Sequence, residues 1–281
     1  MTRHAAGSWS FGKAVKSVLC TLFVLTLCSF SAVHVAAAEN AKTIVVLVDL
    51  SDSTEAARQT YLEDFRRILD TMSGSDVLLV SRITKSASAV DSLPIQVALK
   101  EAGIGDNPRK AQHDNWIAQT RALVKFEELI KPTENATPIA DVLEKLPRWF
   151  ANFPNPRKVV VLFSDMRESS PSTANFESKT GWAPAAMDAF LARLKKDRLI
   201  PDLTGVRIYV AGALDKDDKR LRAVRAFWQR YFEVAKADFA IHRYDTKLVK
   251  FDECQGRDGC PGKFFTDHRE GEVRKALEQR K

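Results

Sequence analysis

The pattern of apolar and polar residues changes period along the chain, and each change predicts a new secondary-structure element. The run TIVVLVDL, which begins at Thr43, is almost continuously apolar and rich in β-branched residues, as expected for a strand buried on both faces of a parallel sheet. From Thr54 to Met72, apolar residues recur three or four positions apart, which predicts an amphipathic helix. Residues 76–83 return to a strand pattern. A β-α-β succession is therefore expected here.

Strand and helix patterns continue to alternate up to Tyr244. Further strands are predicted at residues 158–164, 206–214 and 239–244. Further helices are predicted around residues 116–130, from Thr137-Pro138 to a stop at Pro147, around residues 187–194, and from Asp217, where Phe227, Trp228 and Tyr231 have the spacing of core residues. This alternation predicts an α/β fold with a doubly wound, mostly parallel central sheet and helices on both faces. In such sheets ligands bind beyond the carboxyl ends of the strands.

The first 38 residues have the pattern of a secretory signal peptide. Arg3, Lys13 and Lys16 precede an apolar run over residues 17–33, and the small residues 36–38 precede Glu39. We expect cleavage after Ala38 and a periplasmic or secreted protein. An uncleaved membrane anchor is the alternative, because the apolar run is almost long enough to span a bilayer.

Residues 39–246 are expected to form one domain, and residues 247–281, which are charged and rich in glycine, a C-terminal extension. Removal of the signal segment deletes three basic residues and no acidic ones, so the formal net charge falls from +7 to +4. The remaining Lys and Arg alternate with Asp and Glu, as in residues 215–222, and do not form a basic stripe. No nucleic-acid partner is therefore expected.

Cys254 and Cys260 are the two cysteines that remain after cleavage, and they lie in the turn-rich stretch CQGRDGCPG. An exported protein meets oxidising conditions, so we expect them to form a small disulfide loop. Two free thiols are the alternative. A zinc site is less favoured, because no second Cys or His pair has suitable spacing.

Oxygen-bearing side chains gather in three segments that follow predicted strands or open a helix. These are DLSDS, with Asp49, Ser51 and Ser53, then the helix start at Thr137, and the pair ending in Asp165. Together they resemble the metal-ion-dependent adhesion site of von Willebrand factor A domains. That family has a DxSxS motif after the first strand, a Thr in a later loop and an Asp after the fourth strand, and the resemblance extends over about residues 43–244.

The resemblance implies that the hydroxyls of Ser51, Ser53 and Thr137 bind a divalent cation directly, while Asp49 and Asp165 act largely through water. Magnesium is the expected cation because it prefers oxygen ligands and keeps several waters, with calcium or manganese as alternatives. One position is left for an Asp or Glu side chain of a partner protein. The implied function is a non-enzymatic, exported binding module that grips another protein.

Two residues depart from the commoner family pattern. Asp52 stands where glycine is frequent and adds negative charge, which shifts the preference toward calcium or manganese. Met166 also stands where glycine is frequent, and we expect it to limit how closely a ligand approaches. Residues 166–182 should lie near the rim of the site and are a candidate partner-contacting loop, together with residues 103–109.

The same residues are also compatible with roles that need no metal. Good helix-capping residues are Ser51, Asp52, Ser53 and Thr137, and Asp165 suits a turn. A haloacid-dehalogenase-like phosphatase is an alternative, because that family also carries an acidic motif after its first strand. Ser164 and residues 217–218 could imitate its later motifs. The general acid of that motif, however, would fall at Ser51, which cannot protonate a leaving group. A metal-independent interaction domain is the third alternative.

Overall fold

The computed structural model describes residues 40–85, 93–103, 105–134, 136–170, 174–249 and 251. The chain divides into two units, Met1–Asn40 and Ala41–Lys281, and the elements below belong to the second. The predicted signal peptide and the predicted Cys254–Cys260 disulfide lie outside the described residues. Within the described residues, no helix is long and apolar enough to cross a membrane.

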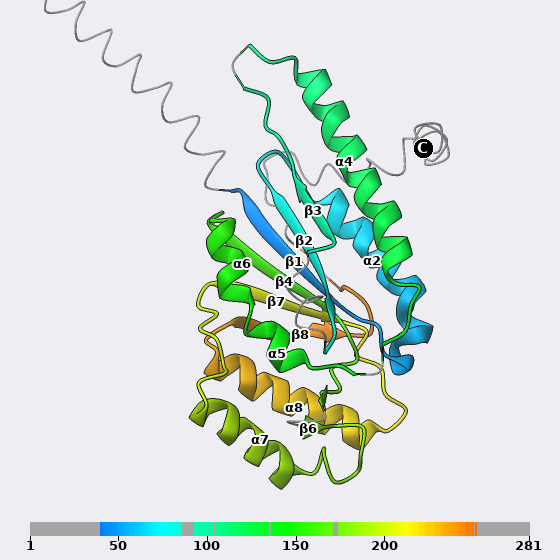
Figure 1. The fold of residues 1–281 in the computed structure, drawn as a ribbon, viewed down its shortest axis with the longest axis vertical. Helices are drawn as coiled ribbons and strands as arrows, with labels where there is room; N and C mark the ends of the chain where they lie inside the picture. Colours follow the sequence, from blue (N-terminus) through cyan, green and yellow to red (C-terminus); the bar gives the residue numbers. More distant parts are fainter. Residues whose placement is uncertain are drawn as a thin grey trace, which may run out of the picture. The chain divides into compact units, whose positions relative to one another are not determined.

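A six-stranded sheet forms the centre of the second unit, with strand order β3-β2-β1-β4-β7-β8 (Figure 1). The strands are β1 (Lys42–Asp49), β2 (Val77–Ile83), β3 (Ile95–Ala98), β4 (Arg157–Phe163), β7 (Val206–Ala211) and β8 (Asp238–Asp245). All neighbouring pairs are parallel except β2 and β3. The predicted α/β fold with a mostly parallel sheet is therefore confirmed.

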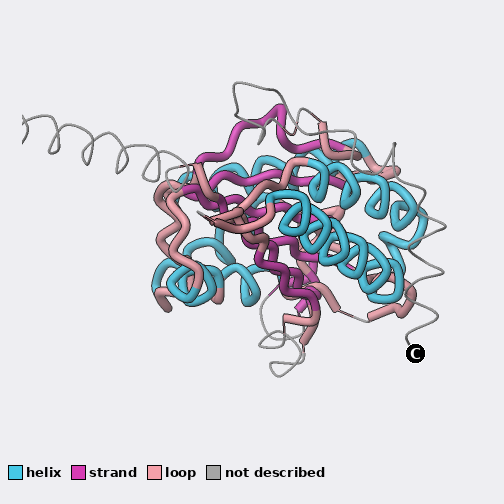
Figure 2. Tube along the Cα trace, turned by 90° about the horizontal axis from the view of Figure 1, so that it is seen from above, coloured by secondary structure: helices cyan, strands magenta, loops and turns pink. Residues whose placement is uncertain are grey.

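Helices cover both faces of this sheet (Figures 1 and 2). Helices α2 (Arg58–Asp70) and α4 (Pro108–Leu129) cover one face, and α5 (Ile139–Leu143), α6 (Leu146–Asn152), α7 (Pro184–Lys196) and α8 (Asp218–Val234) cover the other. Each face of the sheet has its own hydrophobic core, and alternate residues of β1 pack in the two cores. Ile44 and Val46 face α2 and α4, whereas Val45 and Leu47 face the other helices. The run is continuously apolar because both of its faces are buried.

The aromatic residues of α8 are core residues, as their spacing predicts. Phe227, Trp228, Tyr231 and Phe232 are all fully buried. The indole N–H of Trp228 donates a hydrogen bond of 2.7 Å to the carbonyl of Met166. Helix α8 therefore holds the loop that follows β4.

Strand β3 is not predicted by the sequence pattern, and it changes the course of the chain. It has only four residues, so an alternating pattern is hard to recognise, and it runs antiparallel to β2. The chain consequently returns to the amino ends of the parallel strands, where the N–H of Ser75 donates to the carbonyl of Leu99. Residues 103–109 therefore follow the end of the sheet opposite to Asp49, which does not support their predicted contact with a partner together with residues 166–182.

The prediction that Pro147 closes the helix after Thr137 is wrong. Helix α5 ends at Leu143, and Pro147 lies in the first turn of the next helix, α6. A proline is tolerated there because the first turn leaves its backbone N–H groups without intrahelical partners.

The chain still packs on the core beyond residue 246. The N–H of Leu248 donates 2.7 Å to the buried Asp64 carboxylate on α2. The ring of Phe251 lies 5.0 Å from that of Tyr209 in β7. The ordered packing thus extends into the segment predicted to be a C-terminal extension.

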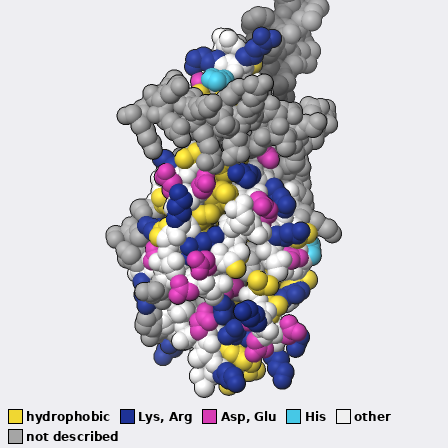
Figure 3. Space-filling model, turned by 90° about the vertical axis from the view of Figure 1, so that its right-hand side faces the viewer, with side chains coloured by type: hydrophobic (Ala, Val, Ile, Leu, Met, Phe, Trp, Pro, Cys, Tyr) yellow, Lys and Arg dark blue, Asp and Glu magenta, His cyan; other side chains and the backbone are white. Residues whose placement is uncertain are grey.

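Charges of both signs are interspersed over the face shown in Figure 3. On α4, Lys110 and Asp114 form an exposed ion pair of 2.9 Å at the spacing that places two side chains on one helix face. Such exposed pairs contribute little to stability.

A buried ion pair anchors the start of β1. The ammonium group of Lys42 lies 2.7 Å from Asp76, the residue just before β2, and both side chains are almost completely buried. The ammonium also donates to the carbonyl of Thr71, and the other oxygen of Asp76 accepts the backbone N–H of Lys42. Each charge is therefore compensated inside the protein.

Candidate metal centre

Asp49 is the last residue of β1 and the centre of the predicted site. Its carboxylate is fully buried. One oxygen accepts the N–H of Ser51 at 2.9 Å and the hydroxyl of Thr137 at 3.3 Å, and the other accepts the hydroxyl of Ser164 at 2.7 Å. Because β1 and β4 are neighbouring parallel strands, the segment after β4 ends beside Asp49. The structure thus brings the three predicted segments together.

The hydroxyls of these segments do not cap helices. Ser51 precedes a 3-10 helix (Asp52–Ala57) without forming a side-chain cap, and its hydroxyl lies 3.0 Å from that of Ser53. Pro138, and not Thr137, takes the N-cap position of α5, and no side chain caps that helix. A capping role for Ser51 and Thr137 is therefore excluded, and their hydroxyls are available for other contacts.

A cavity of about 290 Å³ opens at this point of the sheet. It is lined by Ser51, Asp52, Ser53, Glu134, Ala136, Thr137, Ser169 and Glu177. The three predicted hydroxyl ligands lie on its wall, whereas the buried Asp49 stands behind them. Residues 166–182 supply two of the lining residues, so this loop does lie at the rim, and Asp52 places its charge on the lining as expected.

The charge of Asp49 is poorly compensated. Burial, and then the nearby charge of Asp165, raise the pKa of Asp49 to about 6, although hydrogen bonds from Ser51 and Ser164 act in the opposite direction. No basic side chain of the described residues forms an ion pair with Asp49. A cation in the adjoining cavity would stabilise the ionised carboxylate.

Asp165, in contrast, is already paired. It follows β4 and is 3% exposed, and Arg167 supplies its hydrogen bonds. The guanidinium contacts one oxygen through two nitrogens at 2.7 and 2.6 Å, and the backbone N–H of Arg167 donates to the other at 3.1 Å. Sequence reasoning missed Arg167, because a basic residue two positions after an acidic one does not by itself indicate a contact between the two.

Met166 does not obstruct the cavity, so the expectation drawn from it is wrong. Its backbone has φ of 66°, a left-handed conformation that favours glycine. Its side chain, however, is fully buried in the core on the α8 side of the sheet. The hydrogen bond from Trp228 to its carbonyl helps to offset the cost of this conformation, about 1–2 kcal/mol.

Glu168 links the loop after β4 to the loop that carries Thr137. It is fully buried, and its carboxyl group accepts the N–H of Ala140 in α5 at 3.1 Å. Burial raises the pKa of Glu168 to about 8. Next to it, Ser169 and Thr137 exchange two backbone hydrogen bonds of 2.9 and 3.0 Å. Nothing in the sequence indicates that Glu168 links these loops, because it stands as a single Glu in a polar stretch.

The donor set fits a hard divalent cation. It consists of three neutral hydroxyls on the cavity wall, the carboxylate of Asp49 behind them, and the carboxylate of Asp165, whose charge acts on Asp49. All five donors are oxygens. Among the described residues, no group of three or more His, Cys, Asp or Glu side chains could hold a metal ion. Any cation here would therefore depend on the hydroxyls.

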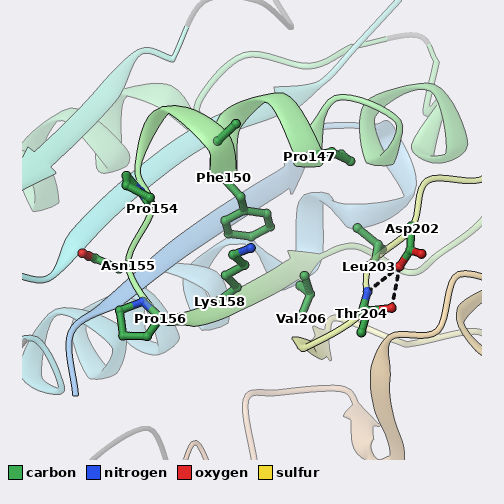
Figure 4. Close-up of a pocket in the computed structure, with 11 residues that line it drawn as sticks. Pro147, Phe150, Pro154, Asn155, Pro156, Lys158, Asp202, Leu203, Thr204 and Val206 are labelled. Atoms are coloured by element: carbon green, nitrogen blue, oxygen red, sulfur yellow. Dashed lines mark hydrogen bonds between the residues drawn. The ribbon is translucent and has the colours of Figure 1, made fainter. Parts of the chain in front are cut away.

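A second cavity, of about 390 Å³, lies at the opposite ends of the strands (Figure 4). Lys158, near the start of β4, points its ammonium toward the ring of Phe150, 5.8 Å from the ring centre. At the other side Asp202 accepts hydrogen bonds from the N–H and hydroxyl of Thr204. None of the predicted metal ligands lines this cavity.

No protein-family model matches the chain. No curated protein matches it either. Several solved structures are similar to it at low identity, and three of them illustrate the likeness. Proximal thread matrix protein 1 from the mussel byssus is 14% identical over 75% of this chain and 44% of its own, with a TM-score of 0.38.

The second is a von Willebrand factor type A protein from Catenulispora acidiphila, 15% identical over 70% of this chain and 42% of its own, with a TM-score of 0.37. The third, the manganese-loaded TRAP protein of Plasmodium vivax, is 16% identical over 67% of this chain and 63% of its own, with a TM-score of 0.33. The chain spans less than two thirds of each of these proteins. At such TM-scores these likenesses say nothing about the chemistry of the site.

Proposed function

We propose that this chain is a protein-interaction module of the von Willebrand factor A type, which holds a divalent cation through Asp49, Ser51, Ser53, Thr137 and Asp165. One observation carries the proposal: three neutral hydroxyls line a cavity, and the buried carboxylate of Asp49 stands behind them without a cationic partner among the described residues. Hydroxyl ligands compensate little of a cation's charge. When bound, the cation would offer an open coordination position to a partner's Asp or Glu side chain.

The charge of the cavity makes this recognition depend on the cation. Asp52, Glu134 and Glu177 all line the cavity. Glu134 is paired with Arg82 at 3.3 Å, and Glu177 with Arg167 at 2.8 Å. These ion pairs compensate the charges of Glu134 and Glu177, whereas no ion pair of the described residues compensates Asp52. An acidic partner that approached the cavity without a cation would therefore be repelled by Asp52. Magnesium is the proposed cation, and the charge that Asp52 adds makes calcium or manganese an alternative.

Asp49 is poorly placed to act as a phosphatase nucleophile. It is fully buried and both of its oxygens already accept hydrogen bonds. It is also absent from the residues that line the cavity. Ser51 occupies the position of the general acid and cannot fill that role. We therefore propose a binding protein and not an enzyme.

The proposed setting is the periplasm or the exterior of the cell, and it rests on the amino-terminal sequence pattern alone. The proposed partner is another protein that presents an Asp or Glu side chain. No nucleic-acid partner is proposed, because basic and acidic residues alternate along the chain.

Thermal unfolding in magnesium, calcium, manganese or EDTA tests the cation site. A ligand that binds only the folded protein stabilises it by about 2.7 kcal/mol at a hundred times its Kd. The unfolding temperature of the wild type should rise with a divalent cation, and that of Ser51→Ala should not. Ser169→Ala is the matched control, because Ser169 lines the same cavity but is not a proposed ligand.

If millimolar divalent cation leaves the wild type unchanged, the metal site is misassigned. The metal-independent interaction domain would then be the better description. If Ser51→Ala responds as strongly as the wild type, a cation binds elsewhere on the protein.

A further inference from the structure

Arg167 already satisfies one of the two carboxylates of the proposed cation site. Its guanidinium is only 12% exposed and contacts Asp165 through two nitrogens, while its backbone N–H occupies the other oxygen of Asp165. Both oxygens of Asp165 therefore have donors from a single residue. Asp49, on the other side of the site, has hydrogen-bond donors but no such charged partner among the described residues.

Arg167 has a second carboxylate within reach. Its Nη1 lies 2.8 Å from Glu177, a residue on the cavity wall. The backbone carbonyl of Glu177 is itself held by Arg220 at 3.2 Å, and Arg220 is paired with Asp215. A chain of ion pairs and one hydrogen bond thus runs from the end of β4 across the rim loop to the start of α8.

A divalent cation and Arg167 would compete for Asp165. Each stabilises the same carboxylate, and two cationic groups beside one another repel, more strongly where water is partly excluded. Arg167 can release Asp165 without losing all charge compensation, because Glu177 also contacts it.

We propose that Arg167 is a built-in counter-ion that competes with the divalent cation for Asp165 and thereby lowers the cation affinity of the site. This inference rests on the proposed cation site. Loading of the site then requires the guanidinium to leave Asp165, with Glu177 as its remaining partner. The site would then bind the cation reversibly, and more weakly than it would without Arg167.

The experiment measures Mn²⁺ affinity by electron paramagnetic resonance of the free ion, in the wild type, Arg167→Gln, Arg167→Lys and Arg220→Gln. Arg167→Gln should bind Mn²⁺ more tightly, on the order of tenfold, because it removes one competing positive charge. Arg167→Lys keeps the charge and should stay closer to the wild type. Arg220→Gln is the matched control, since it removes a nearby charge from the same chain of contacts without a contact to Asp165.

Folding of Arg167→Gln is followed by circular dichroism, because the substitution leaves Asp165 buried without its cation. If this variant is unfolded alone, millimolar Mn²⁺ should restore its fold, and failure to do so overturns the proposal. Equal affinity of the wild type and Arg167→Gln overturns the role of Arg167 but leaves the cation site intact. Absence of Mn²⁺ binding in both proteins overturns the cation site as well.

Discussion

The substitution Glu168→Gln tests the buried carboxyl group behind the Thr137 loop. Glu168 is fully buried, accepts the N–H of Ala140, and has no hydrogen-bond partner for its second oxygen among the described residues. A glutamine has almost the same shape and keeps an acceptor for that N–H. It differs in one decisive property, because it cannot ionise.

The expected magnitude follows from the pKa of Glu168, which burial raises from 4.5 to about 8. Between these values the folded state binds the proton more tightly than the unfolded state. The stability that this proton provides is therefore complete below about pH 4.5 and is lost as the pH rises toward 8. From pH 4 to pH 7, the wild type should lose about 3 kcal/mol through this group, and the glutamine variant should not.

Urea denaturation at several pH values between 4 and 7 measures this difference. The variant should gain about 3 kcal/mol relative to the wild type over this range, whatever constant packing cost the amide adds. Glu233→Gln, at an exposed position of α8, is the control and should follow the wild type. A difference between Glu168→Gln and the wild type that does not change with pH would refute the reasoning.

Three further substitutions test the framework by urea denaturation. Asp76→Asn should cost about 3–5 kcal/mol, because it leaves the buried Lys42 without its counter-charge; a cost below about 1 kcal/mol would argue against the buried pair. Gly212→Ala should cost at least about 2 kcal/mol, because φ is 102° and the new Cβ would lie 2.3 Å from the Tyr61 hydroxyl; a neutral effect would contradict this close approach. Trp228→Phe should cost about 1–3 kcal/mol, since it removes the donor to a buried carbonyl, and an unchanged midpoint would mean that this bond is not formed.

The gathering of the site residues follows from sequence and topology together. Asp49 ends a strand that is apolar on both faces, and Asp165 follows another. The carboxyl ends of parallel strands lie at one edge of a sheet, so these residues meet whenever their strands are neighbours. The alternation of strands and helices therefore predicts the fold class and the sheet edge at which these residues lie, and the neighbouring position of β1 and β4 brings them together.

The partners of individual side chains cannot be predicted in the same way. Two examples are the contact of Arg167 with Asp165 and the burial of the Met166 side chain in the core. Both depend on backbone angles and side-chain packing, which a periodic sequence pattern does not contain. Strand β3 is not predicted because its four residues give too short a pattern. The position of residues 103–109, which follow β3, can therefore not be predicted either. Short elements and buried polar contacts depend on tertiary packing, which overrides local sequence preference.

The most direct test of the proposed cation site is a crystal structure of the protein grown with Mn²⁺ and measured at the manganese absorption edge. We predict one anomalous peak in the cavity, coordinated by the hydroxyls of Ser51, Ser53 and Thr137, with Arg167 withdrawn from Asp165. A cavity without an anomalous peak at millimolar Mn²⁺, or a peak bound only by residues outside it, would contradict the proposed function.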